Sequence, residues 1–261
     1  MADYKEYLDK IRNSKLLYFE SLPLGLTSCE YNTHLLLNKM AEARKSYLLL
    51  MDNERFTDAV LIAGHLLENA AVINYISVSL QASNTKQIKK YLARETVQTL
   101  CDLFKFVGDD VDTETQETID FIMDDFKNRC DIVLSKKAAQ SHEDLVQTIL
   151  RTATNSEKLR IIRNNYEFPV VEDYLRPFRK DLSNFYDFPG IDKKLVLFYS
   201  SYCKIKHCGA SMYASALCKD RVVMDKNQYR DFSPIVVWMC LEYTEKNIKR
   251  ILKEYCTVKS E

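Results

Sequence analysis

The stretch that decides the fold is RFTDAVLIAGHLLENAAVINYISVSL, residues 55–80. Its apolar residues cover more than one face of a helix, and a helix that is apolar on nearly every side is usually buried on all sides. Polar residues such as His65, Glu68 and Asn74 interrupt it too often for a membrane span of about 20 apolar residues. We therefore expect a central helix at about 55–80, buried within a bundle.

The composition predicts an all-α protein. The 261 residues include only five Gly and five Pro, fewer than the average usage of about 7% and 5%. Sheet-rich proteins need many turns, and turns use both residues. Hydrophobic residues make up 46% of the chain, which is enough for a substantial core. We expect a multi-helix bundle of about nine or ten helices around the central one.

Helical periodicity and capping residues place the other expected helices. They cover about 4–19, 29–51, 86–107, 113–134, 142–165 (one interrupted helix or two short ones), 171–186, 192–219 and 233–256. Ser233-Pro234 is a strong start signal, and Pro177 marks a start near Arg176. His142 is expected to be exposed at a helix start. We expect one domain, 1–261, with a weak boundary near 187–191.

Charge and cysteine usage narrow the classes of protein. Lys plus Arg and Asp plus Glu both number 37, whereas a sequence-independent nucleic-acid binder usually has a basic excess. Any contact with nucleic acid must therefore come from a local patch. The N-terminal region lacks the apolar core of a signal peptide, and the eight cysteines form no CxxC pair. We expect reduced thiols, a cytoplasmic location and no membrane partner.

Two short polar sets could carry chemistry. His65, Glu68 and Asn69 share one helix face because they are three and four residues apart. Buried polar groups without partners cost about 1–3 kcal/mol each, so such groups are informative. A second stripe, in the expected helix 192–219, consists of Ser200, Cys203, Lys204 and His207. If the two helices pack together, His65, Glu68, Lys204 and His207 could converge.

The combination of an apolar-His-Leu-Leu-Glu-Asn helix with a later Tyr-Ser-x-Tyr-x-Lys-x-x-His helix resembles a group of uncharacterised bacterial all-helical domains. These are similar to the HEPN superfamily, many of whose members are toxin or defence ribonucleases. The resemblance covers about residues 30–220. The HEPN signature of Arg, a polar residue and a closing His is matched most closely by Lys204-Ile205-Lys206-His207, with Lys in place of Arg and shorter spacing. Gly64-His65 stands where the uncharacterised group usually carries Arg.

The resemblance implies a metal-independent ribonuclease of a bacterial stress or defence system, acting as a homodimer on RNA. His207 would be the general acid or base, since a His with a near-neutral pKa suits that role. Lys204 or Lys206 would stabilise charge on the phosphate, and Glu68 would orient His65 or His207. The alternative is a non-catalytic helical module that binds a partner protein or senses a ligand. In that case the polar cluster is structural, as most buried hydrogen-bonded groups are.

Other candidate sites have weaker signals. A basic and aromatic segment offers Arg160, Arg163, Arg176, Arg179 and Lys180 for contact with nucleic acid. Cys203 with His207, or His65 with its neighbours, supplies only two good ligands, whereas zinc needs three or four. No Walker A, Rossmann or Gly-x-Ser-x-Gly pattern occurs. We expect no metal and no cofactor.

Overall fold

The computed structural model describes residues 4–15, 28–81, 85–107, 112–186, 190–206 and 226–258; side chains at 28–32, 80–81, 85, 204, 226–229 and 249–258 are not described. Most of the described residues are helical, and among them there is a single isolated bridge and no strand, which confirms the all-α fold. The chain divides into two compact units, residues 1–81 with 171–261, and residues 82–170. The expected boundary near 187–191 lies inside the first unit.

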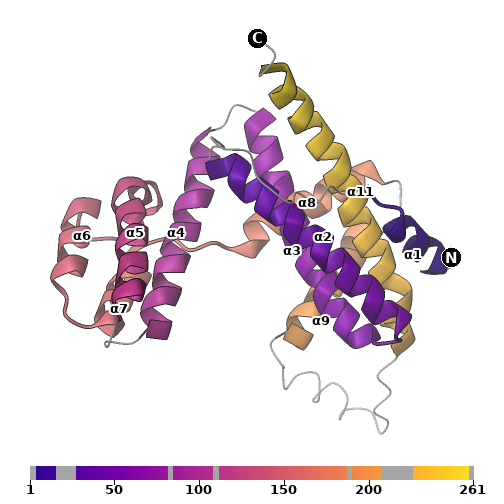
Figure 1. Cartoon of the computed structure of the whole chain (residues 1–261), viewed down its shortest axis with the longest axis horizontal. Helices are drawn as coiled ribbons and strands as arrows, with labels where there is room; N and C mark the ends of the chain where they lie inside the picture. The colour runs from indigo at the N-terminus through magenta and orange to yellow at the C-terminus, as the bar shows by residue number, and fades with distance from the viewer. Residues whose placement is uncertain are drawn as a thin grey trace, which may run out of the picture. The chain divides into compact units, whose positions relative to one another are not determined.

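The first unit is built around α3 (Phe56–Gln81), which packs against four other helices. These are α2 (Ser28–Asp52), α8 (Val171–Phe185), α9 (Ile191–Lys206) and α11 (Lys226–Val258). The short α1 (Tyr4–Arg12) lies mainly against α11. Figure 1 shows α2, α3 and α11 side by side. The buried central helix is therefore confirmed.

Helix α3 is the core of this unit because small and branched side chains cover most of its circumference. Its residues with no exposed surface are Ala59, Val60, Ala63, Leu66, Leu67, Ala70, Ala71, Ile73 and Ile76. Two positions remain open: His65 is exposed and Val78 is 49% exposed. Within the described chain, Phe56–Ser79 has the length and composition of a membrane-crossing helix, but 67% of its apolar window is buried. Such burial is typical of a bundle core.

The last helix starts earlier than its sequence predicts. We expected a start at Ser233-Pro234, but α11 begins at Lys226 and contains Pro234. That prediction was wrong because Ser233 does not act as an N-cap. Its buried hydroxyl lies 2.8 Å from the Tyr47 hydroxyl of α2, so a tertiary hydrogen bond takes the place of the expected cap. Helix α8 begins at Val171, as the expected helix 171–186 does, but it runs through Pro177, so this proline does not mark a start near Arg176.

The second unit has its own core. It contains α4 (Thr85–Val107), α5 (Thr113–Arg129), a 3₁₀ turn (Cys130–Val133), α6 (His142–Arg151) and α7 (Asn155–Asn165). The expected helix 113–134 therefore ends as an α-helix at Arg129, and 142–165 is two short helices. Side-chain caps fix two of the starts: Asp112 accepts from the Thr115 amide at 2.8 Å, and Ser141 accepts from the Asp144 amide at 3.2 Å.

Large buried side chains from every helix of the second unit meet in one cluster. It includes Leu100, Phe104, Phe126, Ile149 and Ile162, and all its members lie between residues 93 and 168. An isolated antiparallel bridge joins Leu134 and Tyr166, which both pack in this cluster. The buried surface of this unit is thus supplied by a contiguous piece of the chain.

Candidate functional site

The Glu68 carboxylate is the centre of the candidate site. Three donors from α9 reach it: the Tyr199 hydroxyl at 3.2 Å, the Tyr202 hydroxyl at 3.0 Å and the Lys206 ammonium at 3.5 Å. Residues 199, 202 and 206 are three and four apart, so they share one face of α9. The expected contact between the central helix and the helix after residue 190 is therefore present, and it is polar.

Gly64 allows this close approach. It lies one turn before Glu68 on α3, and a Cβ atom at this position would overlap the ring of Tyr202. Glycine in a helix interior costs roughly 1 kcal/mol relative to alanine, so its presence needs a packing reason. Here the reason is that the tyrosine ring lies directly on the α3 backbone and carries its hydroxyl to Glu68.

His65 lies on the same turn of α3 and is exposed at one side. Its Nε2 atom lies 3.2 Å from the Asn69 side-chain amide nitrogen. Because that amide nitrogen is a donor, Nε2 accepts, and the neutral ring then carries its proton on Nδ1. Partial burial lowers the pKa of His65, and the nearby Lys39 and Lys206 charges lower it further, against an opposing effect of Glu68.

The α9 donors have pKa values that suit their contacts. Hydrogen bonding to Tyr202 raises the pKa of Lys206, and the Glu68 carboxylate acts in the same direction. Burial raises the pKa of Tyr202 to about 12, and it also raises the pKa of Tyr199. Near neutral pH the site thus combines a neutral imidazole, two neutral phenols and one ammonium. The Lys206 side chain is 45% exposed, so it remains within reach of a ligand, whereas Glu68 is only 16% exposed.

Two of the four predicted catalytic residues are fully described. His65 and Glu68 lie at this site, whereas the Lys204 side chain and all of His207 lie outside the described residues. Tyr199 and Tyr202 were not among the predicted site residues, and Lys206 was predicted only as an alternative to Lys204. A usable signal was present, because Tyr199, Tyr202 and Lys206 have helical spacing.

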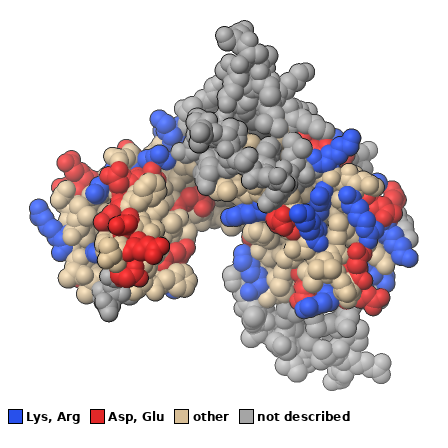
Figure 2. All heavy atoms as spheres, in the orientation of Figure 1, with Lys and Arg blue, Asp and Glu red and all other residues tan. Residues whose placement is uncertain are grey.

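The predicted nucleic-acid-binding residues are distributed over both units. Arg160 and Arg163 lie on α7, and Arg176, Arg179 and Lys180 lie on α8. Arg179 is buried, and its guanidinium donates to Glu172 at 2.7 Å, so it holds helix α8 rather than facing solvent. Arg160 pairs with Glu157 at 3.0 Å. Figure 2 shows both signs of charge on the visible face of each unit.

Both ring nitrogens of His142 have hydrogen-bond partners, which its polar sequence neighbours did not predict. Its Nδ1 lies 2.9 Å from the Tyr166 hydroxyl, and its Nε2 lies 3.1 Å from the Lys127 carbonyl oxygen. Its ring also contacts Phe126. The expectation that His142 is merely exposed was therefore wrong: it is half-buried and joins the start of α6 to the end of α5.

The described side chains form no candidate metal-binding site. Among them, no three His, Cys, Asp or Glu residues lie close enough together to hold one metal ion. Four thiols are described, and all are free: Cys101, Cys130 and Cys240 are buried and Cys203 is half-buried. Burial raises the pKa of Cys101 to about 11 and that of Cys130 to about 12, so both remain thiols near neutral pH.

The fold and site together define an all-α protein with a partly exposed polar cluster between two helices of one unit. No family model, curated protein or solved structure matches the chain.

Proposed function

We propose that the surface formed by His65, Glu68 and Lys206 is an RNA-directed site that acts by acid–base chemistry. One observation carries the proposal: an exposed, neutral imidazole and an exposed ammonium lie around the same carboxylate. An imidazole that is neutral near pH 7 can accept a proton, and an ammonium can offset charge on a phosphate.

The step consistent with these groups is cleavage by the neighbouring 2′-hydroxyl. His65 takes the 2′-hydroxyl proton while that oxygen bonds to phosphorus. The bond from phosphorus to the 5′-oxygen breaks, and the 5′-oxygen takes a proton from water or from Lys206. The products are a 2′,3′-cyclic phosphate and a 5′-hydroxyl. Lys206 can move from Glu68 to the phosphate because their 3.5 Å contact is partly exposed and therefore weak.

The test is cleavage of total RNA by the purified full chain and by His65→Ala and Lys206→Ala. We expect each variant to lose at least about tenfold in rate, within the usual range for general acid–base and electrostatic groups. Lys193→Ala is the matched control because Lys193 is an exposed lysine on the same helix. Equal rates in all four proteins would contradict the proposal. His207→Ala tests the remaining sequence-based prediction in the same assay.

A non-catalytic helical module is the second candidate, and the number of protein donors that already bind Glu68 favours it. Three donors on one carboxylate tie α3 to α9 without any need for a substrate. In that case Glu68→Gln lowers the melting temperature, and neither this variant nor the wild type cleaves RNA. The resemblance noted in the sequence supports the first candidate in the setting of a cytoplasmic homodimer of a bacterial defence system, which light scattering and fractionation would test.

A further inference from the structure

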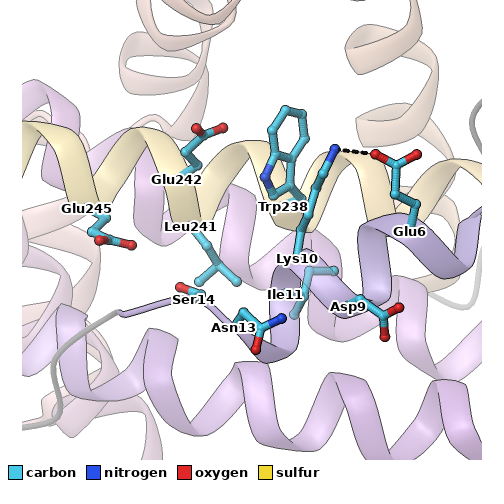
Figure 3. A pocket seen from close by; sticks show the side chains of 10 residues that line it. All are labelled: Glu6, Asp9, Lys10, Ile11, Asn13, Ser14, Trp238, Leu241, Glu242 and Glu245. Carbon is cyan, nitrogen blue, oxygen red and sulfur yellow. Dashed lines mark ion pairs between the residues drawn. The ribbon is translucent and has the colours of Figure 1, made fainter.

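The ammonium of a surface lysine can be held by partners within the chain. Figure 3 shows such a case between α1 and α11, where the dashed line marks the ion pair of Lys10 with Glu6 at 2.7 Å. The Lys10 ammonium also lies 5.0 Å from the centre of the Trp238 ring, a range at which aromatic faces attract ammonium groups. Lys10 is thus held by the chain's own groups.

Lys39 of α2 is an exposed lysine without such partners. It makes no hydrogen bond or ion pair with the described residues. One turn further along α2, Glu42 pairs with Lys45 at 2.9 Å. The adjacent Met40 has no exposed surface, so Lys39 lies at the edge of the buried face of α2. Its ammonium is therefore open to a ligand from solvent.

The Lys39 charge acts on the imidazole of the candidate site. Helix α3, which carries His65, packs against both α2 and α9, whereas α2 and α9 do not pack closely on each other in the described part of the chain. Burial lowers the pKa of His65, and the Lys39 charge lowers it at least as much as the Lys206 charge does. Because exposed charges act over short distances, an ammonium from each of the two flanking helices lies near this ring.

The groups around His65 carry an unbalanced positive charge. Glu68 offsets one ammonium through its contact with Lys206 at 3.5 Å, but no described carboxylate pairs with Lys39. A nucleic-acid strand carries one negative charge per nucleotide. A strand with one phosphate at Lys206 and His65 therefore has a further phosphate to place on the adjacent surface, and on the α2 side Lys39 is available for it.

Given the RNA-directed site proposed above, on which this step rests, we propose that Lys39 binds the phosphate next to the one held by Lys206. The substrate class is then a single strand with at least two phosphodiester groups, rather than a dinucleotide. A single strand is required because the 2′-hydroxyl must align with the leaving 5′-oxygen. Lys39 is a positioning residue in this arrangement, whereas His65 and Lys206 act at the reacting phosphate.

Fluorescence anisotropy with a labelled 2′-fluoro RNA hexamer of mixed bases tests the contact, because this strand keeps its phosphates and has no 2′-hydroxyl to attack them. We expect Lys39→Gln to weaken binding at low salt roughly two- to fivefold. It should also reduce the slope of log affinity against log salt by about 0.7, the value for one phosphate contact on a single strand. Lys45→Gln is the matched control, since Lys45 is an exposed lysine of the same helix that pairs with Glu42; it should leave the slope unchanged.

Two further readouts separate a positioning role from a structural one. An NMR titration should give a higher pKa for His65 in Lys39→Gln than in the wild type, because a nearby positive charge is removed. In the cleavage assay, Lys39→Gln should raise KM for a trinucleotide with little change in kcat. It should leave cleavage of a dinucleotide unchanged, because a dinucleotide has no second phosphodiester.

Three results would overturn the proposal. These are no binding of the hexamer by the wild type at low salt, the same salt slope in the wild type and Lys39→Gln, or an unchanged pKa of His65 in that variant. Binding with the expected slopes but without cleavage of RNA would support the contact at Lys39 and contradict the proposed chemistry. Cleavage by the wild type with an unchanged slope in Lys39→Gln would do the reverse, so the two failures are distinguishable.

Discussion

At the scale of single residues, replacing Gly64 with alanine has two opposed effects on the stability of the protein. Alanine would favour the helix by about 1 kcal/mol, but its Cβ would overlap the Tyr202 ring. Overpacking of this kind costs about 1–3 kcal/mol. We expect Gly64→Ala to lower the free energy of unfolding by up to about 2 kcal/mol, the difference between these two effects, measured by urea denaturation. In a Tyr202→Ala background the same change should be neutral or stabilising; an equal loss in both backgrounds would show that the ring is not the cause.

The His65 imidazole should make stability depend on pH in a defined direction. Its pKa is lowered in the folded protein from an ordinary value of 6.5, so the unfolded chain binds the proton more readily. This contribution to stability is present above about pH 6.5 and is lost as the pH falls toward the lower, folded-state value. Between pH 7 and pH 5 the melting temperature of the wild type should fall more than that of His65→Gln. Parallel curves for the two proteins would contradict the lowered pKa.

The same site shows how far a sequence can define side-chain partners. Spacing predicted that the helices carrying His65 and Glu68 and residues 199–206 could meet, and they do. It did not predict which face of the second helix would be used. The residues that reach Glu68 are Tyr199, Tyr202 and Lys206, which are three and four positions apart and share one face of α9. Rotation of α9 about its axis is set by the packing of Tyr202 on Gly64, which is a tertiary contact.

At the scale of helices, a buried polar chain connects three elements of the first unit. Asn74 of α3 donates to Asp181 of α8 at 3.0 Å and accepts from Asn247 of α11 at 3.1 Å. Both asparagines are buried. Because removing one member leaves buried partners unsatisfied, Asn74→Ala should cost about 2–4 kcal/mol in the free energy of unfolding. Asn128→Ala is the control, since Asn128 bonds only to Asp124 of its own helix among the bonds described; a similar loss in both variants would contradict the network.

The bounds of a helix agree with the sequence-based prediction where no long-range contact alters its end. The expected helices at 55–80 and 86–107 agree with α3 and α4 within about one residue, because an apolar period and a terminal cap or glycine are local features. The start of α11 did not follow its local signal. Ser233-Pro234 has the order of a helix start, but the Tyr47 hydroxyl, far away in the sequence, binds Ser233. Long-range partners of this kind are invisible to periodicity.

At the scale of the whole molecule, residues 82–170 form a continuous segment with a closed core. Every buried member of its hydrophobic cluster, from Ala93 to Tyr166, belongs to this segment. The first unit differs, because its helices come from both ends of the chain. The sequence predicts one domain because no linker of unusual composition separates the two units. Chain order alone does not show which helices share a core.

A fragment of residues 82–170 should therefore fold without the rest of the chain. Domains of this size are marginally stable, with about 0.05–0.15 kcal/mol per residue, so we expect a cooperative but modest thermal transition by circular dichroism.

Phe126 has no exposed surface and contacts both Tyr166 and His142. Replacing it with alanine costs about 3–5 kcal/mol in typical cores, which should unfold the fragment. Exposed Phe121, on the same helix, provides the matched Phe121→Ala control. A fragment that shows no transition, or that responds equally to the two alanines, would mean that its cluster is stable only within the complete protein.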